Sequence, residues 1–91
     1  MKEVLHASYA SVVTALKQLG FYQFTRPGNR ASYRFGYIAS QIHVYLKPLS
    51  KTETQISIHE DVGFGGHVSL QDTPVLRQFL RHIKNAVRRP S

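Results

Sequence analysis

Residues Ile42-His43-Val44-Tyr45-Leu46-Lys47 decide the fold, because apolar and polar side chains alternate along them without a break. Successive side chains of a β-strand point to opposite faces of the sheet. The alternation therefore predicts a strand with one packed face and one solvent face. The packed face would carry Ile42, Val44 and Leu46, and the solvent face His43, Tyr45 and Lys47.

The segments on either side of this stretch also favour strands. Residues 31–38 and 55–59 alternate in the same way, and residues 21–26 are rich in aromatic side chains. Pro27-Gly28-Asn29 supplies a turn between the first two strands, and residues 48–52 connect the last two. We therefore expect an antiparallel meander of four strands, at residues 21–26, 31–38, 42–47 and 55–59.

Helices are expected at both ends of this meander. The first has an apolar stripe at steps of four and three, and it consists of Leu5, Tyr9, Val12, Leu16 and Leu19. Gly20 suits the end of this helix, and Ser8 offers an N-cap for a shorter version that excludes Leu5. Thr73 as N-cap and Pro74 as first helical residue predict the start of the second. Its stripe is Val75, Leu76, Phe79, Leu80, Ile83 and Val87.

The resulting order, α-β-β-β-β-α, predicts an α+β fold of two layers, with an antiparallel sheet and both helices on one face. A chain of 91 residues without a repeat or linker is expected to form a single domain, residues 1–91. There is no cysteine, which excludes disulfides, thiolate metal sites and cysteine nucleophiles. Residues 1–7 mix charges with apolar residues, so we expect a cytoplasmic protein without a membrane segment.

The charge balance indicates a polyanionic partner. Twelve Lys and Arg residues oppose five Asp and Glu, a formal net charge of +7, and the isoelectric point is about 10.2. A value this high is typical of nucleic-acid-binding domains. The alternative is that the cations serve only to keep a small protein soluble.

The positive charge gathers in two places. Arg77, Arg81, Lys84 and Arg88 recur at steps of four, three and four, which puts them on one side of the second helix, and we call them the basic ridge. No acidic residue follows Asp72, although cations near a helix C-terminus could simply complement its dipole. The second cluster lies at the first turn. The predicted phosphate-binding residues are Arg26, Arg30, Arg34, Lys47, Arg77, Arg81, Lys84 and Arg88.

Aromatic and histidine side chains suggest further roles. Tyrosines at strand spacing favour core packing, and only one on the solvent face, such as Tyr45, would be free to stack on a base. His59, Glu60, Asp61 and His67 offer metal donors, but their spacing matches no dedicated zinc site, so we predict no metal and no other cofactor. His59 is a candidate general acid or base at the end of a strand before a glycine-rich segment. The alternative is a surface histidine on an edge strand.

A resemblance to a known family narrows the function. The segments Leu16–Phe21 and Gly28–Phe35, with Arg26 between them, resemble the HicA family of small mRNA-interferase toxins over about residues 12–46. That family has a double-stranded-RNA-binding-like α-β-β-β-α fold. His59 and the segment Thr73–Leu80 are similar to the family's strand-end histidine and final helix, although an extra strand and a longer loop separate them here.

The resemblance implies that the protein acts on mRNA or duplex RNA and has a cognate antitoxin as partner. The family's catalytic histidine matches Arg30 and Ala31, neither of which can transfer a proton at neutral pH. Cleavage is therefore absent, or is carried by His59 or His43, or Ala31 replaces a histidine. Two alternatives remain: a non-catalytic protein that binds nucleic acid or inhibits a nucleic-acid enzyme, and an adaptor that docks on an acidic protein.

Overall fold

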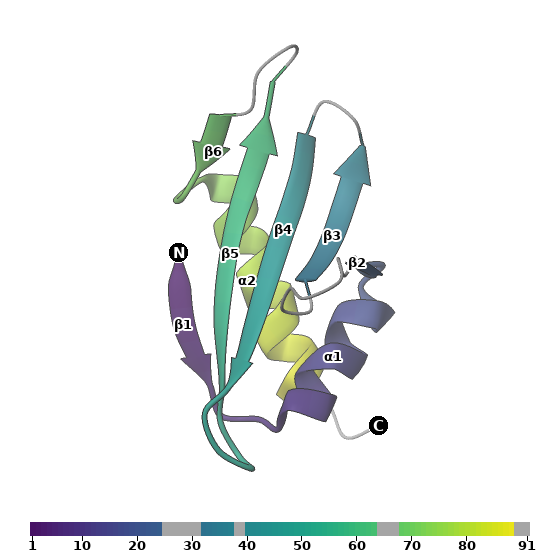
Figure 1. The fold of residues 1–91 in the computed structure, drawn as a ribbon, viewed down its shortest axis with the longest axis vertical. Helices are drawn as coiled ribbons and strands as arrows, with labels where there is room; N and C mark the ends of the chain where they lie inside the picture. The colour runs from purple at the N-terminus through teal and green to yellow at the C-terminus, as the bar shows by residue number, and fades with distance from the viewer. Residues whose placement is uncertain (25–31, 38–39, 64–67, 89–91) are drawn as a thin grey trace.

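The computed structural model describes residues 1–24, 32–37, 40–63 and 68–88 (Figure 1). The fold is α+β, with an antiparallel sheet and two helices. The elements follow in the order β1 (Lys2–Leu5), α1 (Tyr9–Gln18), β2 (Tyr22–Phe24), β3 (Ser32–Tyr37), β4 (Ser40–Pro48), β5 (Thr54–Val62), β6 (Val68–Leu70) and α2 (Pro74–Arg88). None of the described helices is long and apolar enough to span a membrane.

The long hairpin of β4 and β5 forms the centre of the sheet, whose strand order is β1-β5-β4-β3-β2. Every strand pair is antiparallel. Two short strands share the outer edge of β5: β1 pairs with residues 54–57 and β6 with residues 60–62. Figure 1 shows β1 and β6 on the same side of β5, although they come from opposite halves of the chain.

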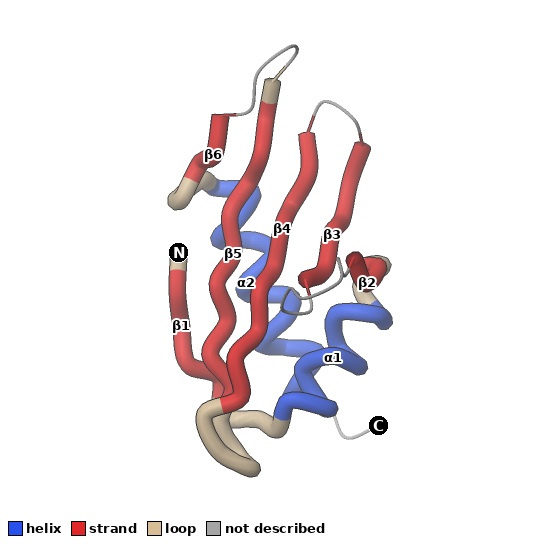
Figure 2. The backbone as a smooth tube through the Cα atoms, in the orientation of Figure 1, coloured by secondary structure: helices blue, strands red, loops and turns tan. Residues whose placement is uncertain are grey.

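Both helices pack on one face of the sheet, as the sequence predicts (Figures 1 and 2). The alternation along β4 and β5 is confirmed, because Val44, Ile56 and Ile58 are fully buried against the helices. Leu76 and Ile83 of α2 fill the same core, as do Val12 and Leu16 of α1 and Tyr33 of β3. Neither of the two described helices covers the opposite face of β4 and β5.

The predicted order misses two strands. Residues 2–5 form β1 and not the start of a helix, and Leu5 reaches the core from this strand. The first helix begins after Ser8, whose hydroxyl accepts a hydrogen bond from the Ser11 amide at 3.2 Å, so the shorter alternative is confirmed. Gly20 follows α1 with a φ of 97°, a left-handed conformation that glycine adopts at least cost.

Thr73 begins α2 as predicted and also ties the helix to the sheet. Its hydroxyl oxygen accepts a hydrogen bond from the Leu76 amide at 3.1 Å and donates one to Glu60 Oε1 at 3.0 Å. Glu60 is a buried residue of β5 on the helix-covered face. The start of α2 is therefore fixed in register with β5.

Candidate functional site

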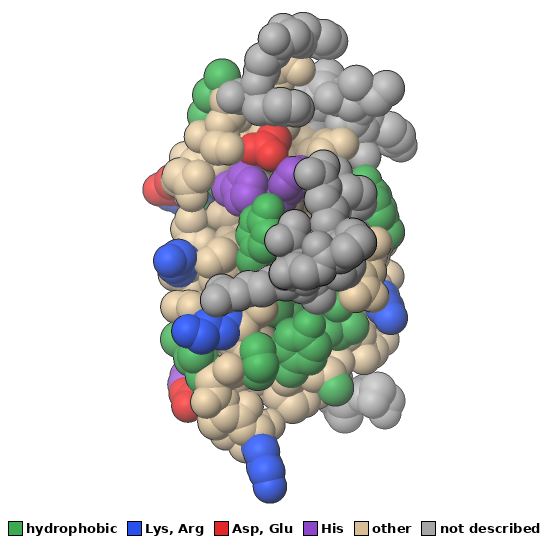
Figure 3. All heavy atoms as spheres, in the orientation of Figure 1, with side chains coloured by type: hydrophobic (Ala, Val, Ile, Leu, Met, Phe, Trp, Pro, Cys, Tyr) green, Lys and Arg blue, Asp and Glu red, His purple; other side chains and the backbone are tan. Residues whose placement is uncertain are grey.

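The face of β4 and β5 that the helices leave uncovered carries rows of polar side chains. Antiparallel pairing sets residues 41, 43, 45 and 47 of β4 opposite residues 61, 59, 57 and 55 of β5. The rows are Gln41 with Asp61, His43 with His59, Tyr45 with Ser57, and Lys47 with Gln55. Figure 3 views this face and shows histidine side chains gathered over β4 and β5 next to an acidic side chain.

The centre of this face is a cluster of His43, His59 and Asp61. The carboxylate of Asp61 faces both rings: Oδ2 lies 3.3 Å from His43 Nδ1, and Oδ1 lies 3.5 Å from His59 Nε2. The two imidazole rings have their centroids 5.0 Å apart. The three side chains are sheltered, with exposed fractions of 10% for His43, 19% for His59 and 14% for Asp61.

Neighbouring side chains hold each member of the cluster. Gln41 Oε1 lies 3.0 Å from His43 Nε2, and the Ser69 hydroxyl donates to Asp61 Oδ1 at 2.6 Å. The ring of Tyr45 stacks on that of His59, with centroids 5.7 Å apart and planes 15° from parallel. The contacts come from β4, β5 and β6, so the sheet itself sets the geometry of the cluster.

His59 does not lie where the sequence pattern suggests. It is neither at the end of a strand nor on an edge strand, because β5 continues to Val62 and is paired on both sides. The three described metal donors of this segment, His59, Glu60 and Asp61, do not lie on one face. Glu60 points to the helix-covered face, His67 lies outside the described residues, and only His59 and Asp61 come together, joined by His43.

His43 lies in the cluster because the register of β4 and β5 sets it opposite His59. From the sequence, His43 is only an alternative to His59 as the residue that carries cleavage, and no local pattern pairs it with Asp61. A signal existed, since an antiparallel hairpin that turns at residues 49–53 sets residue 43 opposite residue 59. The predicted strands of residues 42–47 and 55–59 contain both histidines but end before Asp61, so they do not place its carboxylate beside the two rings.

The basic ridge is partly neutralised. Arg77 makes two hydrogen bonds of 2.8 Å to the carboxylate of Asp72, which precedes the N-cap of α2, and Lys84 pairs with Glu3 of β1. Arg81 and Arg88 are exposed and have no ion-pair partner within the described part of the chain. The absence of acidic residues after Asp72 therefore leaves two of the four ridge cations unpaired, not all of them.

The acidic residues all have partners inside the protein. Besides Glu3 and Asp72, which pair with the ridge, Glu53 lies 3.5 Å from His6, Glu60 accepts from Thr73, and Asp61 faces the two histidines. Since the chain has only five carboxylate side chains, none is left to balance the remaining cations. The surface therefore keeps most of the positive charge.

The other predicted phosphate ligands are placed only in part. Arg26, Arg30 and Ala31 lie outside the described residues. The backbone of Arg34 lies in β3, in register with Tyr22 and His43. Lys47 is exposed on β4, two residues beyond Tyr45 on the uncovered face.

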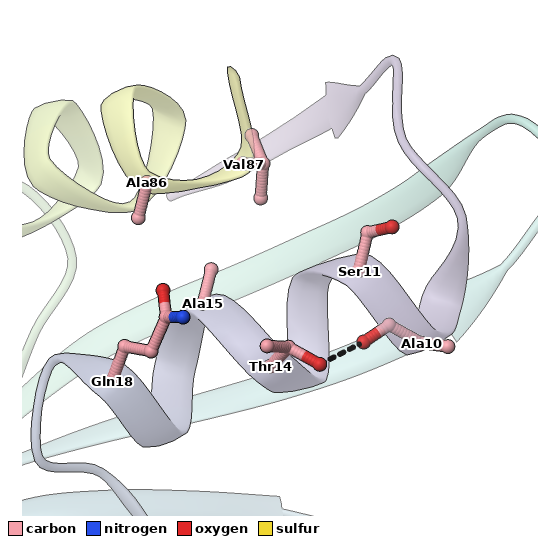
Figure 4. A pocket seen from close by; sticks show the side chains of 7 residues that line it. All are labelled: Ala10, Ser11, Thr14, Ala15, Gln18, Ala86 and Val87. Atoms are coloured by element: carbon pink, nitrogen blue, oxygen red, sulfur yellow. Dashed lines mark hydrogen bonds between the residues drawn. The ribbon is translucent and has the colours of Figure 1, made fainter. Parts of the chain in front are cut away.

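A groove between the two helices is a weaker candidate. Residues of α1 and of the last turn of α2 line it, among them Ala10, Thr14 and Val87 (Figure 4). The Thr14 hydroxyl donates a hydrogen bond of 3.0 Å to the Ala10 carbonyl of its own helix. The lining has no charged side chain among the described residues, so the groove offers nothing to a phosphate.

Comparison with family models, curated proteins and solved structures finds no match to this chain. The resemblance to HicA toxins therefore stays a prediction from the sequence.

Proposed function

We propose that this protein is a small RNA-binding protein. One observation carries the proposal: every carboxylate side chain is engaged inside the protein, while exposed cations on several elements have none to pair with. Phosphate backbones neutralise such cations and release counterions on binding, which supplies most of the affinity of sequence-independent nucleic-acid binding.

The uncovered face of β4 and β5 is the surface that suits RNA best. Tyr45 is 40% exposed and its ring is held by stacking on His59, so little side-chain entropy is lost when a base packs on it. Lys47 follows on the same face and can meet a phosphate. A sheet with an exposed aromatic ring is a common platform for single-stranded RNA.

The helix α2 supplies a second contact surface. Arg81 and Arg88 are seven residues apart, so they lie on one side of the helix about 10 Å from each other. Their guanidinium groups are exposed and suit phosphate contacts. Arg77 and Lys84 can join them only by giving up their pairs with Asp72 and Glu3.

The family resemblance supports a more specific form of this proposal. On that form the protein is a HicA-like toxin with a double-stranded-RNA-binding-like fold, which acts on mRNA in the cytoplasm and is covered by an antitoxin. Ala31 cannot transfer a proton, so cleavage would then need a proton-transfer group at another position, with His59 as the first candidate. This form is tested by incubating a labelled RNA with the chain and, separately, with the Ala31→His variant. If neither protein cleaves RNA or arrests translation, the toxin hypothesis is rejected.

RNA binding itself is tested by fluorescence anisotropy with a labelled single strand of about twenty nucleotides and a duplex of equal length. We expect the Kd to rise steeply between about 50 and 200 mM salt. Tyr45→Ala combined with Lys47→Glu should weaken single-strand binding at least tenfold, because stacking alone contributes ~1–3 kcal/mol per base. Lys17→Glu, an exposed change on α1, is the control for net charge.

The same anisotropy assay tests whether helix α2 contacts RNA. Arg81→Glu combined with Arg88→Glu should raise the Kd for RNA and lower its salt dependence if α2 contacts phosphates. An unchanged Kd removes the helix from the interface and leaves the sheet. Failure of both RNA forms to bind at low salt rejects the proposed function and favours an adaptor that docks on an acidic protein.

A further inference from the structure

We propose that His43, His59 and Asp61 form a binding site for one divalent transition metal ion of the zinc class, held on the uncovered face of the sheet. The site needs no RNA, so it stands whether or not the proposed function is correct. Two neighbouring strands supply all three ligands, β4 one and β5 two.

The spacing of the three donors fits such an ion. Zinc binds imidazole nitrogen and carboxylate oxygen at about 2.0–2.2 Å, so neighbouring ligand atoms in a tetrahedral site lie about 3.4 Å apart. The carboxylate oxygens of Asp61 lie 3.3 Å and 3.5 Å from the nearest nitrogens of the two histidines. One donor atom from each of the three residues falls within 4.8 Å of the others. A single ion between them would reach all three with small side-chain movements.

The two sides of the His43 ring meet different groups. Its Nε2 lies 3.0 Å from Gln41 Oε1, and its Nδ1 faces the carboxylate of Asp61 at 3.3 Å. An imidazole nitrogen and a carboxylate oxygen at this separation are two donors that a single zinc-class ion can share.

The contacts around the ligands are those that zinc sites use to orient them. A metal-binding histidine usually donates its other ring N–H to an oxygen acceptor, and Gln41 Oε1 lies 3.0 Å from the Nε2 of His43 for that role. The ligating carboxylate is itself hydrogen-bonded, here by Ser69 at 2.6 Å. Tyr45 stacks on His59 and fixes its ring plane. All three ligands are therefore positioned before any ion binds.

The donor set also selects the kind of metal. Two imidazoles and one carboxylate suit zinc and its neighbours in the first transition row, whereas magnesium and calcium prefer oxygen donors. Three protein ligands leave a fourth position, which a water molecule or another oxygen donor can occupy. Because His59 and Asp61 retain exposed fractions of 19% and 14%, an ion can enter from solvent.

Metal titration of the untagged, EDTA-treated chain tests the site. Calorimetry with Zn²⁺ and the visible absorption of Co²⁺ should both show one equivalent, with a Kd in the micromolar range or tighter, and Zn²⁺ should raise the melting temperature. His59→Gln and Asp61→Asn should each weaken Zn²⁺ binding by about a hundredfold, and Gln41→Leu, which keeps all ligands, by about tenfold.

The matched control is His82→Gln, which removes an exposed histidine of α2 and should leave the affinity unchanged. Circular dichroism shows whether each variant is folded. If a ligand variant does not fold, Gln41→Leu still tests the site, because it keeps all three ligands. The proposal is overturned if the chain binds no Zn²⁺ at micromolar concentration. It is also overturned if folded His59→Gln or Asp61→Asn binds Zn²⁺ as tightly as His82→Gln does.

Discussion

At the scale of single residues, Tyr33 has an unusually high pKa. Its side chain is 2% exposed in the core, and burial followed by the neighbouring Tyr9 raises its pKa to about 12. An unfolded chain ionises its tyrosines near pH 10. The stabilisation from the neutral phenol is therefore complete below about pH 10 and is lost as the pH rises toward about 12.

We expect two measurable results from Tyr33. The ultraviolet absorbance of phenolate should reveal a tyrosine that ionises near pH 12, and Tyr9→Phe should lower that pKa without returning it to 10, because burial is the larger cause. The unfolding free energy of the native chain, relative to Tyr33→Phe, should fall by up to roughly 1.4 kcal/mol per pH unit above pH 10. A Tyr33 that ionises at pH 10 contradicts this.

Residue types in the candidate site could be predicted, but their partners could not. The sequence identifies His59 and the ridge cations, because those depend on residue type and local spacing. It does not pair Lys84 with Glu3, since helix α2 meets strand β1 only in the folded chain. It does not bring His43 to Asp61 either, because that contact depends on the register of two strands.

At the scale of elements, α2 depends on its N-cap residue. Thr73 accepts a hydrogen bond from the Leu76 amide and donates one to Glu60, which is 9% exposed. The first bond satisfies an amide at the helix start, and the second satisfies a buried carboxylate. One hydroxyl thus joins the helix to strand β5 of the sheet.

Replacement of Thr73 should therefore destabilise the protein more than loss of a helix cap alone. We expect Thr73→Ala to lower the free energy of unfolding by about 2 kcal/mol, since cap removal usually costs ~1 kcal/mol and the Glu60 carboxylate loses a donor as well. Thr73→Ser should recover most of this. Urea denaturation followed by circular dichroism measures both, and equal stability of Thr73→Ala and the native chain contradicts the role.

The elements with strong patterns were predicted, and the weakly patterned ones were not. Alternation over β4 and β5 and the caps at Ser8 and Thr73 are local features of sequence. β1 and β6 are four and three residues long, and only Leu5 in them is buried. Pairing with β5 makes them strands, and no local pattern reports such pairing.

At the scale of the whole molecule, the excess of positive charge should make the melting temperature depend on the salt concentration. A formal net charge of +7 on a chain of 91 residues repels itself, and dissolved salt screens this repulsion. We expect the melting temperature to rise by a few degrees between about 20 and 300 mM NaCl. Arg81→Glu combined with Arg88→Glu lowers the positive charge and should show a smaller rise. A melting temperature that falls with salt would mean that ion pairs such as Arg77–Asp72 outweigh the repulsion.

The shared outer edge of β5 has a consequence for the order in which the protein can fold during synthesis. β1 leaves the ribosome before the other strands of the sheet, and its partner residues 54–57 follow about fifty residues later. β6 and α2 come later still, and Leu76 and Ile83 must arrive before the core is closed. A nascent chain therefore carries an unpaired β1 and an open apolar face until β5 and α2 have followed. Such surfaces are the ones that chaperones bind, and the chain should reach its native state only after α2 has emerged.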